Sequence, residues 1–286
     1  MEYSKFKSIF DKIIFEKSKA DLIRKVANSP ERYIGLFRPT KPKSKLLQNL
    51  LQSHEIRFGD AFEKLLEEYL IENGFEILEK NFKYENGERL NLDQFFCKDE
   101  FFYFIEQKVR DDHDSTKKRG QIANFEKKLS TLINLYDNKH LKGFFYFIDP
   151  NLTKNKNYYE NELKQMSNDY GVELHICYGK EFFKLINLEN IWEEIIQYLQ
   201  KWRSELPDTP EINFDINPDQ SFEEIKDLPP YIFRKLFSND KLVKEIVFTL
   251  FPKKVVLKKL LRYFENKSEK KIYKTLKELL EDILAN

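Results

Sequence analysis

The sequence of 286 residues predicts an α/β protein, with a mixed sheet flanked by helices and a helical C-terminal region. Segments rich in aromatic and β-branched residues are typical of strands, and they occur at 75–84, 90–97, 101–110, 141–150 and 172–178. Segments with helical spacing of apolar residues occur between or before them, at 55–72, 122–136 and 158–170. Strands interleaved with helices therefore favour a sheet covered on both faces.

The N-terminal part is expected to consist of helices joined by a basic connector. Residues 3–27 have helical spacing, and Ser29-Pro30 ends that pattern. Two prolines among basic residues follow, and this connector is either an arm that lies along DNA or a plain linker; it contains Arg38, Pro39, Lys41, Pro42, Lys43 and Lys45. The helix at 55–72 then ends at Asn73-Gly74, and a turn is expected at 85–88.

Charged residues stand at the end of the strand at 101–110. Glu106 and Lys108 are two residues apart, so they share one face of that strand. The preceding strand, 90–97, is separated from it by the polar residues Lys98-Asp99-Glu100, so a hairpin would bring Asp93 close to Glu106. Buried charges are costly unless they are paired or bind a metal. Two carboxylates and a lysine at a strand end are suited to a hard divalent cation.

The pattern of Asp93 followed by Glu106-Gln107-Lys108 resembles the motif of the PD-(D/E)xK nuclease superfamily, which includes most type II restriction endonucleases. The resemblance implies a restriction-endonuclease-like core, with Asp93, Glu106 and the Gln107 carbonyl as metal ligands. It implies that Lys108 is the catalytic lysine, which orients or deprotonates water or stabilises charge. The sequence departs from the motif at Asn91-Leu92, where the family often has a proline.

The resemblance also implies activity, cofactor and partners. We expect a type II restriction enzyme that hydrolyses double-stranded DNA at specific sequences with Mg²⁺, for which Mn²⁺ can substitute. One catalytic centre per chain and short symmetric sites favour a homodimer, and a cognate DNA methyltransferase is expected as a separate protein. Two alternatives stay open: a DNA repair or junction-resolving nuclease of the same fold, and a non-catalytic DNA-binding α/β protein.

A glutamate on the helix at 55–72 joins the metal cluster in many members of the superfamily. Glu63 lies at the border of the apolar stripe of this helix, and we expect it to be the catalytic glutamate, with Glu55 as the second choice. The alternative is that Glu63 is an ordinary solvated helix residue.

A polar, basic segment directly follows the catalytic strand and is expected to bind DNA. Its basic members suit phosphates, and its amides suit phosphates or base edges. Charge runs are usually solvated loops, but the position beside the expected metal site favours DNA contact. The candidate residues are Arg110, His113, Ser115, Lys117, Lys118, Arg119, Gln121 and Asn124.

Composition excludes several other classes of protein. Apolar residues make up 41% of the chain and aromatic residues 15%, enough for a core, and the net charge is only +1. Cys97 and Cys177 lie in apolar strands and are expected to be reduced core residues. The four histidines lack metal-site spacing and no glycine-rich phosphate loop is present, which argues against a zinc enzyme or a nucleotide-driven motor. Without an 18-residue apolar run or a signal-peptide pattern, we expect a cytoplasmic protein that does not enter a membrane.

The domain organisation is predicted in three parts. Residues 1–52 form the N-terminal helix and basic connector, 53–206 the nuclease core, and 207–286 a helical region for DNA binding or dimerisation. Within the last part, residues 241–277 contain twelve basic and three acidic residues. This excess charge indicates either phosphate binding or a helical cap with solvated lysines.

Overall fold

The computed structural model describes residues 1–84, 87–138 and 140–285, so half of the turn expected at 85–88 lies outside the described residues. The chain divides into two compact units, one made of residues 1–9 and 59–206 and the other of residues 10–58 and 207–286. Helices α1 (Tyr3–Phe15) and α4 (Pro42–Glu72) contribute to both units. The division differs from the three sequence segments because residues 10–58 pack with the C-terminal region.

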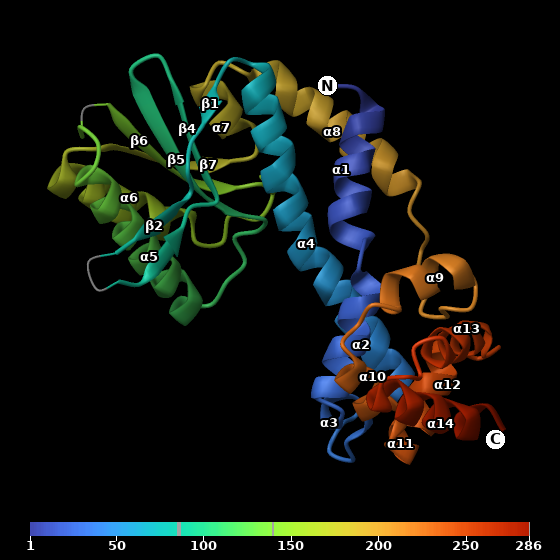
Figure 1. Cartoon of the computed structure of the whole chain (residues 1–286). Helices are drawn as coiled ribbons and strands as arrows, with labels where there is room; N and C mark the ends of the chain where they lie inside the picture. Colours follow the sequence, from blue (N-terminus) through green and yellow to red (C-terminus); the bar gives the residue numbers. More distant parts are fainter. Residues whose placement is uncertain (85–86, 139, 286) are drawn as a thin grey trace. The chain divides into compact units, whose positions relative to one another are not determined.

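The first unit contains a five-stranded mixed sheet, as predicted. Its strands, in spatial order, are β1 (Glu76–Ile77), β4 (Gln94–Lys98), β5 (Phe101–Lys108), β6 (Leu141–Phe147) and β7 (Glu173–Tyr178). The β1–β4 and β4–β5 pairs are antiparallel, whereas β5–β6 and β6–β7 are parallel. The antiparallel hairpin therefore lies beside a parallel half of the sheet (Figure 1).

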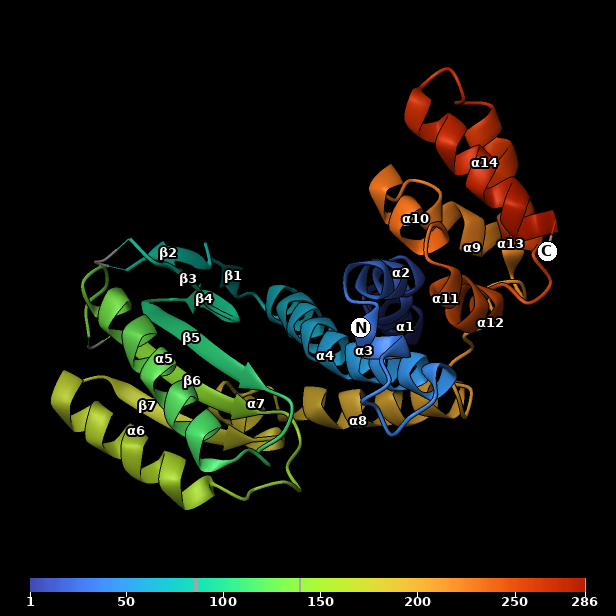
Figure 2. The same ribbon diagram turned by 90° about the horizontal axis from the view of Figure 1, so that it is seen from below.

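Helices cover both faces of this sheet, which explains the nearly continuous apolar sequence of β6. On one face lie α5 (Ser115–Ile133) and α6 (Lys156–Tyr170), and Figures 1 and 2 show both helices on the same side. Phe145 of β6 stacks there on Tyr159 of α6, with ring centroids 4.9 Å apart. On the other face lie α7 (Lys180–Leu185) and the 59–72 part of α4, where Phe144 contacts Phe182. Helix α8 (Glu189–Ser204) completes this unit.

Gly143 is the third residue of β6, in register with Phe104 of β5 and Leu174 of β7. A Cβ atom at this position would lie 2.5 Å from the Phe104 ring and 2.6 Å from the Leu174 side chain. The absence of a side chain therefore lets two apolar residues close over the backbone of β6.

Helices are the only regular elements among the described residues of the second unit, so the prediction of a helical C-terminal region is confirmed. Aliphatic and aromatic side chains from both of its chain segments form one core. Its further elements are α2 (Ser18–Asn28), α3 (Glu31–Ile34), α9 (Pro218–Ile225), α10 (Pro230–Phe237), α11 (Asp240–Leu242), a π-helical turn (Val243–Val247), α12 (Phe248–Leu250), α13 (Val255–Glu265) and α14 (Lys271–Ala285).

The helix boundaries at the N-terminus differ from the sequence prediction. The single helix expected at 3–27 is interrupted, because Lys17 adopts a left-handed conformation with φ of 64° between α1 and α2. The basic connector is much shorter than expected, because α4 begins at Pro42. Proline has no N–H to donate and has a helical φ, so the first helical position accepts it well.

The strands expected at 75–84 and 90–97 are also divided. The segment at 75–84 forms β1 and β2 (Asn81–Lys83), and the segment at 90–97 forms β3 (Arg89–Asn91) and β4. Strands β2 and β3 pair in a separate two-stranded sheet. The chain therefore leaves one sheet and enters the other immediately around Asp93.

Helix α5 begins at Ser115, seven residues before the start predicted from the sequence. Asp114 accepts a hydrogen bond of 2.8 Å from the Lys117 backbone N–H and caps the helix. Most of the expected DNA-binding segment is consequently helical rather than a loop. Cys97 is half-buried and Cys177 buried, both with free thiols. Within the described residues, no helix has the length and apolar character needed to cross a membrane.

Candidate active site

The β4–β5 hairpin brings Asp93 beside Glu106, as predicted from the sequence. Gln94 pairs with Ile105, so Asp93 immediately before β4 lies next to Glu106 immediately after Ile105. The hairpin turns at Asp99, whose φ of 54° lies in the left-handed region that aspartate tolerates better than most residues.

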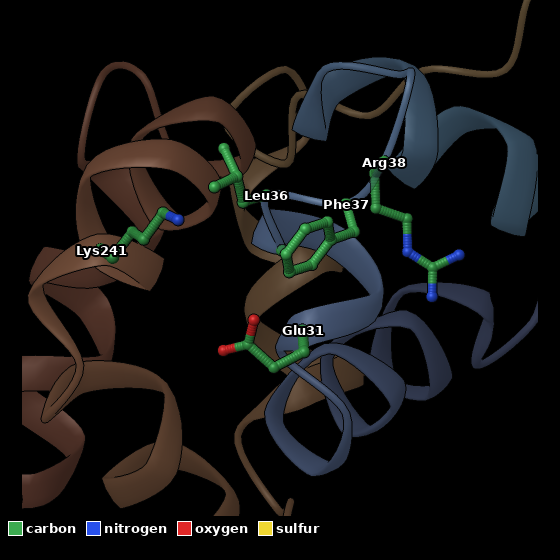
Figure 3. Close-up of a pocket in the computed structure, with 6 residues that line it drawn as sticks. Glu31, Leu36, Phe37, Arg38 and Lys241 are labelled. Atoms are coloured by element: carbon green, nitrogen blue, oxygen red, sulfur yellow. The ribbon is translucent and has the colours of Figure 1, made fainter.

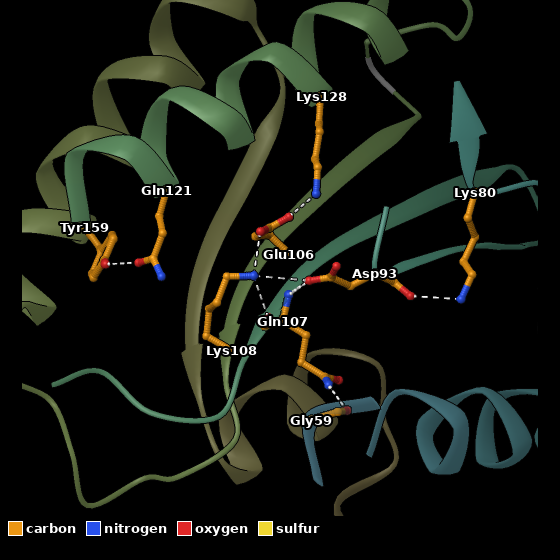
Figure 4. Close-up of polar contacts among 9 residues, drawn as sticks. All are labelled: Gly59, Lys80, Asp93, Glu106, Gln107, Lys108, Gln121, Lys128 and Tyr159. Carbon is orange, nitrogen blue, oxygen red and sulfur yellow. Dashed lines mark hydrogen bonds and ion pairs between the residues drawn. The ribbon is translucent and has the colours of Figure 1, made fainter. Parts of the chain in front are cut away.

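Lys108 lies beside Asp93 and Glu106, and these three residues together with Gln107 are called the cluster below. Its ammonium Nζ lies 2.6 Å from Glu106 Oε1, 2.8 Å from the Gln107 carbonyl oxygen and 3.4 Å from Asp93 Oδ2 (Figure 4). The Gln107 backbone N–H also donates a 2.6 Å hydrogen bond to Asp93 Oδ2. Three oxygen atoms, from the same groups that are expected to bind a metal, thus converge on one positive charge.

These donors fit a hard divalent cation. Within the described residues, no group of three or more His, Cys, Asp or Glu side chains converges as a metal site. The available set is instead two carboxylates and one main-chain carbonyl, and their three oxygens already surround an ammonium group. Mg²⁺ takes oxygen ligands, needs only one or two protein carboxylates and keeps several waters, so this donor chemistry suits it.

Burial and the neighbouring charges shift the pKa values of all three charged side chains. Burial and the neighbouring Glu106 charge raise the pKa of Asp93. Burial alone would also raise the pKa of Glu106, but the positive charges of Lys108 and Lys128 outweigh it and lower that pKa. For Lys108, burial favours the neutral amine and would lower the pKa. The negative charges of Asp93 and Glu106 outweigh this effect and raise the pKa of Lys108. At neutral pH the cluster therefore contains a charged Lys108 ammonium beside the Glu106 carboxylate.

Lys128 on α5 is a further residue of the cluster, and it was not among the residues predicted from the sequence. Its ammonium group contacts Glu106 Oε2, and only 5% of the residue is exposed. The available signal was its spacing: Lys117, Gln121, Asn124 and Lys128 follow one another at intervals of four, three and four residues, so they share a helix face. Its partner is 22 residues away in sequence, which no local pattern reveals.

Glu63 lies in the part of α4 that belongs to the first unit. Burial raises its pKa to about 8, and the negative charge of Asp93 contributes to this increase. Glu63 is half-buried, so it is not fully solvated as in the alternative interpretation. Glu55, the second choice, is exposed and belongs to the other unit.

Two buried glutamines connect α4 to the hairpin. Gln94 Nε2 donates a 2.6 Å hydrogen bond to the Glu63 main-chain carbonyl, and Gln107 Nε2 donates one of 3.3 Å to the Gly59 carbonyl. These carbonyls are one helical turn apart, so both amides hold the same side of α4. Neither side chain was predicted to have this role.

The predicted DNA-binding residues lie in the loop after β5 and in the first half of α5. Those exposed to solvent are Arg110, Ser115, Lys117 and Arg119. The others, His113, Lys118, Gln121 and Asn124, are partly covered. Burial lowers the pKa of His113, and the Lys118 ammonium lies 4.3 Å from the centre of the Tyr158 ring. Gln121 accepts a 2.7 Å hydrogen bond from the Tyr159 hydroxyl. Figure 4 shows that Gln121 and Lys128 extend from the same side of α5.

Asp111 anchors the loop that precedes α5. It is fully buried, and its carboxylate accepts hydrogen bonds from Asn155 N at 2.7 Å, Asn155 Nδ2 at 2.8 Å and Tyr178 OH at 2.9 Å. The loop that carries Arg110 and His113 is therefore attached to the start of α6 and the end of β7.

The second unit contains a surface pocket of about 360 Å³. Figure 3 shows Glu31, Leu36, Phe37, Arg38 and Lys241 around it. Phe37 is fully exposed and Leu36 is 85% exposed. None of the residues predicted to be catalytic belongs to this unit.

The lysines of the C-terminal region fall into two groups. Some have partners within the unit: Lys259 lies 2.6 Å from Asp219, Lys277 lies 3.2 Å from Glu265, and Lys254 donates to the Ile283 carbonyl. Others are exposed to solvent, namely Lys244, Lys253, Lys258, Lys270, Lys271 and Lys274. The second group is the one available to an external anion.

Comparison with known proteins identifies the family. The model of the family "Type II restriction endonuclease, HinfI" matches the chain over residues 2–94 and 79–203, which together cover more than half of it. No curated protein and no solved structure gave a significant match. The match includes all four residues expected to be catalytic, and it favours a restriction enzyme over the repair nuclease and the non-catalytic DNA-binding protein.

Proposed function

The chain belongs to the HinfI family of type II restriction endonucleases, and from this premise we propose that it cleaves double-stranded DNA at a specific sequence by Mg²⁺-dependent phosphodiester hydrolysis. Asp93, Glu106 and the Gln107 carbonyl hold the cation, Lys108 and Glu63 complete the site, and Mn²⁺ substitutes for Mg²⁺. The observation that carries the proposal is the convergence of three oxygens on the Lys108 ammonium.

Hydrolysis of a phosphodiester requires an activated water, stabilisation of charge on the phosphoryl oxygens and help for the leaving 3′-oxygen. The chemistry supplied by a divalent cation here is stabilisation of negative charge and a lower pKa of water. Asp93 and Glu106 supply the negative charge that holds the cation close to the phosphate. Their position at the end of the hairpin, with Glu106 buried, limits competition from bulk water.

Lys108 acts as a protonated group in this proposal. Because Asp93 and Glu106 raise its pKa, it is positively charged before a cation binds. Asp93, Glu106 and the Gln107 carbonyl would hold a cation in place of the ammonium. Lys108 can then donate hydrogen bonds to the attacking water or to the phosphoryl oxygens, which supports orientation and charge stabilisation more than proton abstraction.

DNA binding is assigned to two sets of residues. The exposed and partly covered residues from Arg110 to Asn124 lie next to the catalytic strand and contact the DNA near the scissile bond. The exposed C-terminal lysines add affinity that does not depend on sequence. Cutting both strands of a symmetric site requires two such centres, so we propose a homodimer on DNA. A separate methyltransferase protects the host's own sites.

The test is digestion of phage DNA by the purified protein with Mg²⁺, Mn²⁺, Ca²⁺ or excess EDTA, followed by electrophoresis. Discrete bands with Mg²⁺ and Mn²⁺ but not with EDTA are expected. With Ca²⁺ we expect DNA binding in a gel-shift assay with little cutting. A smear would replace the proposal with a nonspecific nuclease, and full activity in EDTA would exclude the metal-dependent mechanism. Sedimentation of the complex on a cognate duplex should give two chains per duplex.

A further inference from the structure

A buried lysine needs a negatively charged or hydrogen-bonding partner, because removing an ammonium group from water is costly. Among the buried residues that the structure describes, Lys128 is the one that carries a positive charge. It contacts Glu106 Oε2, on the side of the carboxylate that faces α5 (Figure 4). Its charge also opposes the increase in the pKa of Asp93 that burial and the Glu106 charge cause.

The two oxygens of Glu106 have different partners. Oε1 accepts from Lys108 at 2.6 Å, on the side of Asp93, whereas Oε2 contacts Lys128. Lys108 comes from the same strand as Glu106, and Lys128 comes from the helix that covers the sheet. The plane of the carboxylate is therefore fixed from two directions, and only Oε1 points toward the other metal-binding groups.

We infer that Lys128 is a positioning residue for the cation site, a role that rests on the proposed function. It holds Oε2 so that Glu106 presents Oε1 alone to the cation. It also keeps Oε2 of the buried carboxylate paired, whether Oε1 is held by Lys108 or would be held by a cation. Outer contacts of this kind orient ligands, and removing one typically lowers metal affinity or activity by about 10- to 100-fold.

The direction in which replacing Lys128 changes cation affinity distinguishes a positioning role from a simple electrostatic effect. A positive charge close to a cation repels it, so removing a bystander lysine would leave cation affinity unchanged or increase it. Removing a residue that orients the ligand lowers the affinity. Lys128→Met, which keeps the length of the side chain without its charge, is therefore expected to bind Mn²⁺ about tenfold or more weakly than the unaltered protein.

The experiment titrates the full-length chain with Mn²⁺ and measures free Mn²⁺ by electron paramagnetic resonance, so it does not depend on cleavage. The matched control is Lys127→Met, because Lys127 is adjacent but pairs on the surface with Glu88 at 3.3 Å. Lys127→Met should bind Mn²⁺ as the unaltered protein does. Lys128→Arg, which retains a charged donor to Oε2, should recover most of the affinity. If Lys128→Met fails to fold, Lys128→Gln takes its place.

A second readout is the Mg²⁺ dependence of DNA cleavage. In Lys128→Met the half-saturating Mg²⁺ concentration should rise about tenfold or more, with a smaller change in the rate at saturating Mg²⁺. Equal or tighter Mn²⁺ binding by a folded Lys128→Met variant would overturn the inference while leaving the proposed function in place. If the unaltered protein neither binds Mn²⁺ at this site nor cuts DNA, the proposed function itself fails.

Discussion

Gln94 Nε2 donates a 2.6 Å hydrogen bond to the main-chain carbonyl of Glu63. This contact joins the residue directly after Asp93 to the helix residue expected to assist the metal site. Because Gln94 is fully buried, the contact is shielded from water and fixes the helix on the hairpin. Substitutions in the cluster therefore affect both structure and chemistry, and the two effects need separate measurements.

Glu106→Gln should reduce cleavage by about 100-fold or more, the scale expected for the loss of one group that stabilises charge. Glu106→Ala is a poorer test, because it leaves the buried Lys128 ammonium without its partner. Removing one partner of a buried ion pair costs about 3–5 kcal/mol. Chemical denaturation should show Glu106→Ala to be much less stable than Glu106→Gln. Near-normal cutting by Glu106→Gln would contradict the role of Glu106 as a ligand.

Asp93→Asn and Lys108→Met should abolish cutting with smaller effects on folding, because both side chains are partly exposed. Removing a carboxylate also reduces repulsion of the DNA backbone, so the DNA affinity of Asp93→Asn should be kept or increased. Gel-shift titration in Ca²⁺ together with a cleavage assay in Mg²⁺ checks both statements. Retained cleavage by either variant would remove that residue from the mechanism.

Glu63 should make the metal-free protein less stable as pH rises. Its pKa is about 8 in the folded state against an ordinary value of 4.5, so the folded state binds the additional proton between these values. The contribution of Glu63 to the free energy of unfolding is fully present below about pH 4.5 and is lost as pH rises through about 8. Glu63→Gln cannot lose this proton, so its thermal unfolding temperature should fall less between about pH 6 and about pH 9. Parallel curves for both proteins in EDTA would contradict the raised pKa.

Asp111→Ala should destabilise the first unit by about 2 kcal/mol or more, because it leaves the Asn155 backbone N–H and the Tyr178 hydroxyl unpaired, at about 1–3 kcal/mol each. The matched control is Asp112→Ala, since Asp112 is exposed and its pairing with Arg110 at 3.9 Å is a surface contact. Urea denaturation of both variants measures the difference. Equal stabilities would show that Asp111 does not anchor the loop.

DNA affinity and sequence recognition should respond to different substitutions. Replacing the exposed Lys253, Lys258 and Lys274 by alanine should weaken binding to all sequences and flatten its salt dependence, by about 0.9 in slope for each phosphate that is no longer neutralised. Asn124→Ala should reduce cognate cutting far more than nonspecific binding. Affinities for cognate and scrambled duplexes at several salt concentrations distinguish the two. The opposite pattern would identify the C-terminal helices as the recognition element.

The β4–β5 hairpin is predictable because its signals are local. Aromatic strands, a polar turn and alternation along β5 place Asp93, Glu106 and Lys108 together without knowledge of the rest of the chain. The contacts of Lys128, Gln94 and Gln107 are not predictable in this way, because they join helices to strands far away in sequence. Periodicity shows only that such a residue faces the interior, and not which group it meets there.

Element boundaries are less predictable for a different reason. Pro42 lies among basic residues that are typical of a connector, although proline also favours the first position of a helix, where α4 begins. The expected strand at 75–84 is divided between two sheets, because its first part pairs with β4 and its second part with β3. Local propensity cannot decide between two available partners for the same segment.

Gly143 shows that sensitivity to substitution need not mark a chemical role. The Phe104 ring lies where a Cβ of residue 143 would be, and Phe104 shares a face of β5 with Glu106 and Lys108. Any side chain at 143 must displace that ring or Leu174, at a cost of about 1–3 kcal/mol for overpacking. A genetic selection for variants that no longer cut should therefore recover position 143 alongside the carboxylates. Variants at position 143 would differ from variants of the carboxylates by being temperature-sensitive. Lowering the growth temperature restores cutting when the defect is one of packing, but it does not replace a missing ligand.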